Sequence, residues 1–142
     1  MMHDALQMSN LTSRFYACLD ARDYDGVIAC CADDAVWHRR GQPVTGHAAI
    51  RKALASRPLD FHTGHIVTNV IVEQASDTEG RVMFYMAGHP YNGEVPDGQY
   101  VPLPHAHILA AYCDTMCKVG NRWFISEKKL VRTLYQDAQK LR

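Results

Sequence analysis

The sequence has no long hydrophobic run and no excess of charge of either sign. Its longest uninterrupted apolar stretches, 27–32 and 108–113, have six residues each, whereas a membrane-spanning helix needs about 20. Fifteen Lys and Arg balance fifteen Asp and Glu, so no net field draws the chain toward nucleic acid or an anionic membrane. We therefore expect neither nucleic acid nor a membrane among its partners.

The sequence also lacks the features of an exported or disulfide-stapled protein. The start, Met1-Met2-His3-Asp4, has no basic region followed by an apolar one, so we expect the chain in the cytoplasm. Its five cysteines form no C-x-x-C pair, which favours buried free thiols over a zinc or redox site. No serine lies in a G-x-S-x-G context and no glycine-rich phosphate loop occurs, so neither a hydrolase nor a nucleotide-binding protein is indicated.

What the sequence does contain is helical spacing in its first 60 residues. Apolar positions predict an amphipathic helix over about 4–19, and Asp23 is placed to cap a second, short helix. A short strand over 35–38 separates it from a third helix, 47–56, which Pro58 ends. Three helical segments are therefore expected before the chain reaches residue 60.

Beyond residue 60 the apolar pattern changes to period two. It predicts strands over about 65–72, 82–89, 100–119 and 123–131, with a hairpin turn at Gly120-Asn121. Helices first and antiparallel strands afterwards indicate an α+β fold in a single domain over 1–142. A curved sheet bent around the long N-terminal helix leaves an internal pocket where chemistry can take place.

Eight histidines give the chain an unusual supply of acid–base groups. Alternation places His65 on one strand face with Val67 and Ile71, so an inward face would bury the imidazole and require a partner. Asp20, at the end of the first helix, is the candidate partner. A carboxylate on Nδ1 fixes the tautomer and leaves Nε2 as a base.

A metal site would be a competing use of the same histidines. His105 and His107 share one strand face in the predicted pattern, but no nearby Glu completes a cupin-type ligand set. His62 and His65 are three residues apart on a strand and therefore face opposite ways. We expect no metal and no cofactor.

Five segments of the chain match a known family in order and spacing. They are 19–25, 33–37, 46–50, 65–70 and 120–125. Through them the sequence resembles SnoaL-like domains of the nuclear transport factor 2-like superfamily over about residues 5–132. Relatives include scytalone dehydratase, polyketide cyclases, ketosteroid isomerases and the small subunits of ring-hydroxylating dioxygenases. The resemblance implies a cone-shaped, mixed or antiparallel sheet.

The resemblance also implies roles for individual residues. Asp20 and His65 match the aspartate and paired histidine of scytalone dehydratase, and His89 looks like that enzyme's second catalytic histidine. Leu19 and His38 stand where the dehydratase has tyrosines. Two changes make the implied pocket less polar, since a serine and an asparagine that contact the dehydratase's substrate are replaced by Ile108 and Ala110.

Together these observations predict a cofactor-independent lyase, isomerase or cyclase. His65, held by Asp20, would remove a proton from a small apolar carbonyl compound or an aromatic polyketide-like molecule. The proton donor to the developing enolate is expected among His38, His89 and Tyr85. The side chains expected to contact the substrate are Tyr24, Trp37, Tyr85, Ile108 and Ala110.

A non-catalytic function is the alternative, as a ligand-binding domain or as an assembly subunit similar to the small subunit of aromatic-ring dioxygenases. If Ile108 and Ala110 point inward, Leu109 and Ala111 point outward with His105 and His107. An outer sheet face with exposed apolar residues favours self-association. We expect a homodimer or homotrimer packed through that face.

Overall fold

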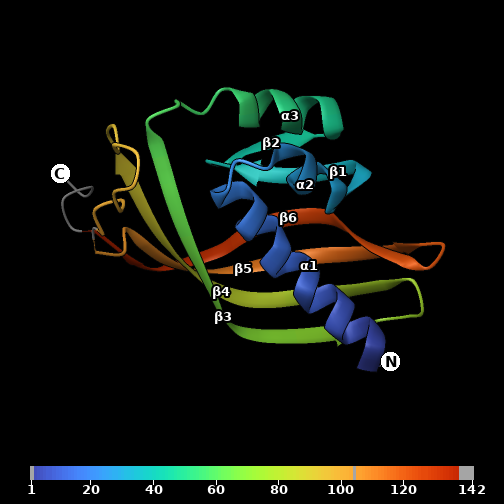
Figure 1. The fold of residues 1–142 in the computed structure, drawn as a ribbon. Helices are drawn as coiled ribbons and strands as arrows, with labels where there is room; N and C mark the ends of the chain where they lie inside the picture. Colours follow the sequence, from blue (N-terminus) through green and yellow to red (C-terminus); the bar gives the residue numbers. More distant parts are fainter. Residues whose placement is uncertain (1, 104, 138–142) are drawn as a thin grey trace.

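The computed structural model describes residues 2–103 and 105–137, and in these it contains three helices and six strands (Figure 1). The predicted order of helices before a run of strands is confirmed, with the addition of a short strand, β2, ahead of the third helix. The helices are α1 (Met2–Asp20), α2 (Tyr24–Ala29) and α3 (His47–Ala55). The strands are β1 (Cys31–Arg39), β2 (Gln42–Thr45), β3 (Phe61–Gln74), β4 (Glu79–Asn92), β5 (Ile108–Val119) and β6 (Arg122–Gln136).

The six strands form one mixed sheet in the order β2-β1-β6-β5-β4-β3. Neighbouring strands are antiparallel except β1 and β6, which run parallel. The sheet curves around α1, and α2 and α3 lie beside β1 and β2 (Figure 1). This arrangement confirms the predicted α+β fold. No helix in residues 2–103 or 105–137 is long and apolar enough to cross a membrane.

The local signals that define the helices are those expected from the sequence. Asp23 caps α2, its carboxylate accepting a hydrogen bond from the backbone N–H of Gly26 at 2.9 Å. One stripe of α1 is buried against the sheet, and one of its two aromatic members, Phe15, packs edge-on against Trp37 of β1 with ring centroids 5.4 Å apart. This packing positions the C-terminal part of α1 against the sheet.

A buried ion pair lies beneath α1. Lys128 of β6 donates to both carboxylate oxygens of Asp114 of β5 at 2.7 and 2.8 Å, and Thr12 donates to the same carboxylate at 2.7 Å. The Lys128 ammonium also lies 4.5 Å from the ring centroids of Phe15 and Tyr16. Because each charge has a partner, this pair fixes how α1 sits on β5 and β6.

A β-bulge in β3 changes the predicted face pattern. Asn69 adopts a positive φ of 53°, and the pairing with β4 shifts register between Thr68 and Ile71. An inserted residue reverses the alternation, so Val67 packs against the core whereas Ile71 is 57% exposed. The expectation that Ile71 shares the inner face of His65 is wrong, and this bulge is the reason.

The segment before β5 also differs from the prediction. The strand begins at Ile108 rather than at Tyr100, because glycines and prolines interrupt the residues between β4 and β5. His105 and His107 therefore lie outside the sheet, and strand alternation does not apply to them. The predicted two-residue turn at Gly120-Asn121 is present between the paired residues Val119 and Arg122.

Candidate active site

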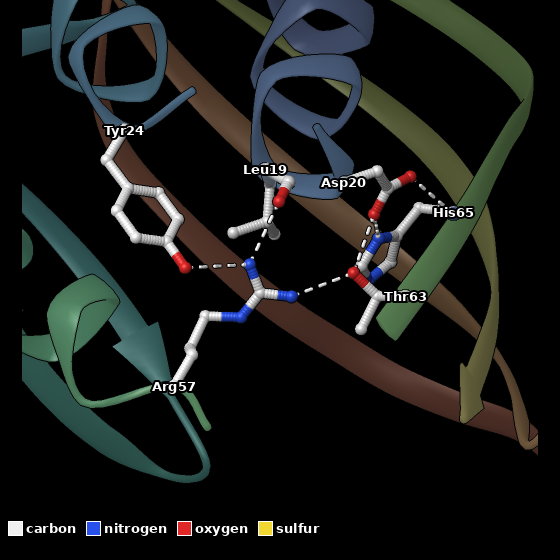
Figure 2. Close-up of polar contacts among 6 residues, drawn as sticks. All are labelled: Leu19, Asp20, Tyr24, Arg57, Thr63 and His65. Atoms are coloured by element: carbon white, nitrogen blue, oxygen red, sulfur yellow. Dashed lines mark hydrogen bonds and ion pairs between the residues drawn. The ribbon is translucent and has the colours of Figure 1, made fainter. Parts of the chain in front are cut away.

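The carboxylate of Asp20, the last residue of α1, lies against three hydrogen-bond donors of β3. Its Oδ2 accepts from the backbone N–H of His65 at 2.8 Å. Its Oδ1 accepts from the hydroxyl of Thr63 at 2.8 Å and from Nδ1 of His65 at 2.5 Å (Figure 2). A carboxylate at the C-terminal end of a helix gains nothing from the helix dipole, so these donors are what stabilise it there.

This contact determines how the imidazole is presented. An ionised carboxylate only accepts hydrogen bonds, so Nδ1 of His65 carries the donated proton and Nε2 carries the lone pair. The ring of Tyr16 packs against the imidazole at a centroid distance of 4.9 Å. Burial raises the pKa of Tyr16 well above its usual range, so this neighbour stays neutral. His65 is thus held in one tautomer and one orientation.

His65 lines a pocket of about 200 Å³ formed by the end of α1, the bent part of β3 and β4, β1 and the segment before β5. Two expected contacts, Trp37 and Ile108, contribute to its walls, and His89 also lines it. Four more lining residues are apolar, which suits a small organic ligand, and the wall also holds three arginines. These further apolar lining residues are Leu19, Phe61, Met86 and Pro90.

Two residues expected to contact a substrate lie just behind the pocket wall. Tyr24 is on α2, with its hydroxyl 3.5 Å from an Nη1 of Arg57, and Arg57 itself lines the pocket. Ala110 is fully buried on β5 and is outside the set of lining residues. Both support the wall without forming its surface.

Two expected proton donors lie on the opposite face of the sheet. His38 neighbours the inward-facing Trp37 on β1, and its Nε2 lies 3.4 Å from a carboxylate oxygen of Glu127. Tyr85 lies between the buried Phe84 and Met86 on β4, so alternation turns it outward. We therefore correct the expected set by leaving out His38 and Tyr85.

Several pocket residues were not expected from the sequence, among them a histidine and an arginine. His107 lines the pocket although it was assigned to the outer face, and its Nδ1 lies 3.9 Å from a carboxylate oxygen of Asp137. Arg57 lines it as well, although it is 7% exposed and follows the end of α3. The proline-rich composition before His107 was a usable signal of irregular chain, whereas nothing in the local sequence distinguishes Arg57 from a surface arginine.

Metal binding is the alternative use of the histidines that the sequence raised. Within residues 2–103 and 105–137, no three His, Cys, Asp or Glu side chains are grouped so as to hold a metal ion. The described residues instead place an oriented imidazole at a small pocket, with a second histidine in the same wall.

The family of SnoaL-like domains matches residues 1–129 of the chain. The chain belongs to the SnoaL-like family. No curated protein matches this SnoaL-like chain in sequence.

Several solved structures share the fold of this SnoaL-like protein. A candidate scytalone dehydratase from Novosphingobium aromaticivorans is 19% identical, covers 96% of this chain and 87% of its own, and has a TM-score of 0.77. A candidate aromatic ring hydroxylase from the same organism is 20% identical, covers 100% and 99%, and has a TM-score of 0.72. A protein of unknown function from Nostoc punctiforme is 20% identical, covers 92% and 91%, and has a TM-score of 0.74. At these identities the similarity concerns the fold.

Proposed function

We propose that this SnoaL-like protein is a cofactor-independent acid–base enzyme that removes a proton from the carbon next to a carbonyl group. The observation that carries the proposal is the 2.5 Å contact between Asp20 and Nδ1 of His65, at the wall of a small pocket. A histidine oriented in this way is a general base, and such groups contribute about 10²- to 10⁴-fold in rate.

The reaction we propose is the loss of water from a β-hydroxy carbonyl compound, or the shift of a double bond next to the carbonyl. In the first case Nε2 of His65 takes the proton as the C–H bond breaks and an enolate forms. The enolate electron pair then makes the new carbon–carbon double bond, while the C–O bond breaks and the oxygen leaves as water. The carboxylate of Asp20 stabilises the imidazolium that forms on His65.

We propose His89 as the group that gives a proton to the leaving oxygen. His89 lines the same pocket as His65 and comes from β4, the strand paired with β3. His107 lines the pocket too, and its imidazole lies near the carboxylate of Asp137. It is our second candidate for the proton donor.

The test is a screen of β-hydroxy ketones and enones, followed by ultraviolet absorbance as conjugation is gained or lost. We expect turnover by the wild-type protein and a loss of at least about 100-fold in His65→Ala. His62→Ala is the matched control, since His62 belongs to β3 but is outside the set of residues that line this pocket. Equal activity in His65→Ala and wild type removes His65 from the mechanism.

The outer face of the sheet favours a second candidate function, a binding or assembly role. Paired residues of β3 to β6 form an apolar row there: Ile66, Ala87, Leu109 and Tyr135. Ile66 is 57% and Tyr135 is 73% exposed. Such a row is suited to packing against another protein surface, and we propose a second copy of this chain as the occupant. Recovery of the protein only in complex with a different, larger subunit favours the assembly role over the enzyme and overturns the second copy as the occupant.

A further inference from the structure

Arg57 is a buried cation whose contacts are all with neutral groups. It is 7% exposed. Its Nη1 donates to the backbone carbonyl of Leu19 at 2.9 Å and lies 3.5 Å from the hydroxyl of Tyr24, and its Nη2 donates to the hydroxyl of Thr63 at 2.8 Å (Figure 2). Guanidinium groups taken out of water are ordinarily paired with a carboxylate or phosphate. The counter-charge expected beside Arg57 is therefore missing from its described contacts.

The guanidinium of Arg57 also retains unused hydrogen-bonding capacity. It has five N–H groups, and the contacts to Leu19, Tyr24 and Thr63 engage three of them. Nε–H and one hydrogen on Nη2 have no partner among the residues that the structure describes. Because Arg57 lines the pocket, a ligand there can accept hydrogen bonds from its guanidinium. The planar guanidinium can bind a planar anion such as a carboxylate through two parallel hydrogen bonds.

Two more arginines line the same pocket. Arg39 is half-buried, donates to the carbonyl of Ala53 at 3.2 Å, and lies over the ring of Trp37 at 5.6 Å. Arg40 follows it and is exposed. Burial, and after it the charges of Arg40 and Arg57, lower the pKa of Arg39, which is consistent with three close positive charges.

No carboxylate offsets these charges in the described pocket wall, since none of its residues is Asp or Glu. Asp20 is separated from Arg57 by the hydroxyl of Thr63 and is engaged by His65. A small cavity lined by charges of one sign concentrates ions of the opposite sign. The pocket therefore favours an anion more than the apolar carbonyl compound expected from the sequence.

We propose that the substrate carries a carboxylate group that Arg57 binds, with Arg39 and Arg40 completing the anion site. This inference rests on the proposed function for the reaction and adds the class of substrate. Thr63, which contacts Arg57, and His65 are two residues apart on β3, a separation of about 7 Å. When Arg57 holds the carboxylate of a substrate, the carbon that loses its proton to His65 is therefore a few bonds from that carboxylate. A short oxo- or hydroxycarboxylic acid has this spacing.

The test is calorimetric binding of benzoate and of its neutral isostere benzamide to the full chain. Measured at about pH 8, where free imidazoles are largely uncharged, the comparison isolates the contribution of the arginines. We expect benzoate to bind about 10- to 100-fold more tightly than benzamide, the range for hydrogen bonds to charged groups. Equal affinities for the two compounds overturn the proposal.

Single substitutions then assign the site. Arg57→Gln is expected to abolish the preference for benzoate, but it also removes the contact with the end of α1 and so can impair folding. Arg40→Gln avoids this problem, because Arg40 is exposed. We expect it to weaken the binding of benzoate by at least about threefold and to leave the affinity for benzamide unchanged. Arg132→Gln, an exposed arginine of β6 outside the pocket, is the matched control. A preference for benzoate that is as large in Arg40→Gln and in Arg39→Gln as in the wild type contradicts the assignment.

The same binding measurement separates this inference from the proposed function. Benzoate has no acidic C–H, so its binding does not require His65 to act as a base. His65→Gln is expected to retain the preference for benzoate while losing turnover. Turnover that depends on His65 without any preference for benzoate overturns the carboxylate site alone, and benzoate preference without turnover overturns the reaction alone.

Discussion

Asp20 is the residue on which the proposed chemistry most depends, and its position explains why. At the C-terminal end of α1 the helix dipole disfavours a negative charge, so a merely structural residue there is better served by a neutral or basic side chain. The carboxylate is instead held by Thr63 and by two groups of His65. The arrangement orients the imidazole of His65, although a negative charge at this position lowers the stability of the end of α1.

Asp20→Asn tests this interpretation. The amide keeps the shape but offers a donor where His65 needs an acceptor, so we expect kcat/KM to fall by about 10²- to 10⁴-fold with a smaller effect on thermal stability. In the wild type, kcat/KM is expected to rise with pH to a plateau, because the base acts only in its unprotonated form. A lowered melting temperature with unchanged activity and pH profile would show that Asp20 only ends the helix.

A second carboxylate, Asp4 on α1, links the N-terminal turn to the β5–β6 hairpin. Hydrogen bonds from Trp123 and Lys118 lower the pKa of Asp4 from 3.8 to about 2. A pKa depressed in the folded state stabilises the fold above pH 3.8, and this contribution is lost as the pH falls toward about 2. We expect Asp4→Asn to be less stable than the wild type near neutral pH and the difference to vanish at about pH 2, as measured by urea unfolding. A difference independent of pH contradicts this.

At the scale of elements, the ion pair between β5 and β6 is expected to be the most sensitive feature of the core. Lys128→Met leaves the fully buried Asp114 without its countercharge, so the free energy of unfolding should fall by about 3–5 kcal/mol. The double substitution Lys128→Met with Asp114→Leu should recover most of the loss, because no charge then remains buried. Urea denaturation measures both variants, and a single variant as stable as the wild type would be inconsistent with this account.

Sequence patterns predict an element well where its signals are local. The buried stripe of α1, the Asp23 cap of α2 and the turn at Gly120-Asn121 all depend on neighbouring residues, and each is present. The bulge at Asn69 depends on how β3 pairs with β4, so alternation alone placed Ile71 on the wrong face. Parallel pairing of β1 with β6 has no local signal either.

The candidate site divides in the same way. The contact between Asp20 and His65 was predictable because a buried histidine requires a partner and the helix end supplies a carboxylate. The presence of Arg57 in the site was not predictable, since its burial results from the packing of α1, α2 and β3 around it. His107 was misplaced because the irregular segment before β5 was interpreted as strand.

At the scale of the whole molecule, the apolar row on the outer face predicts association. Ile66 and Tyr135 are exposed large side chains at opposite edges of that row, with Leu109 between them. We expect a homodimer or homotrimer by sedimentation at micromolar concentration, and Ile66→Lys with Tyr135→Lys should convert it to monomer. Arg14→Gln, at an exposed position of α1 on the other side of the sheet, is the control that should leave the mass unchanged. A monomeric wild-type mass would count against the outer face as an interface.

The central claim is that His65, oriented by Asp20, removes a proton from carbon next to a carbonyl, and solvent deuterium exchange measures that step directly. The protein is incubated in D₂O with short ketones and oxo acids, including 4-oxopentanoate, that are first shown to bind by calorimetry. Proton NMR then follows loss of the signal next to the carbonyl. We predict exchange well above the buffer rate with wild type, reduced by at least about 100-fold in His65→Gln. Exchange at the buffer rate for every compound that binds, or equal exchange in His65→Gln, would contradict the account.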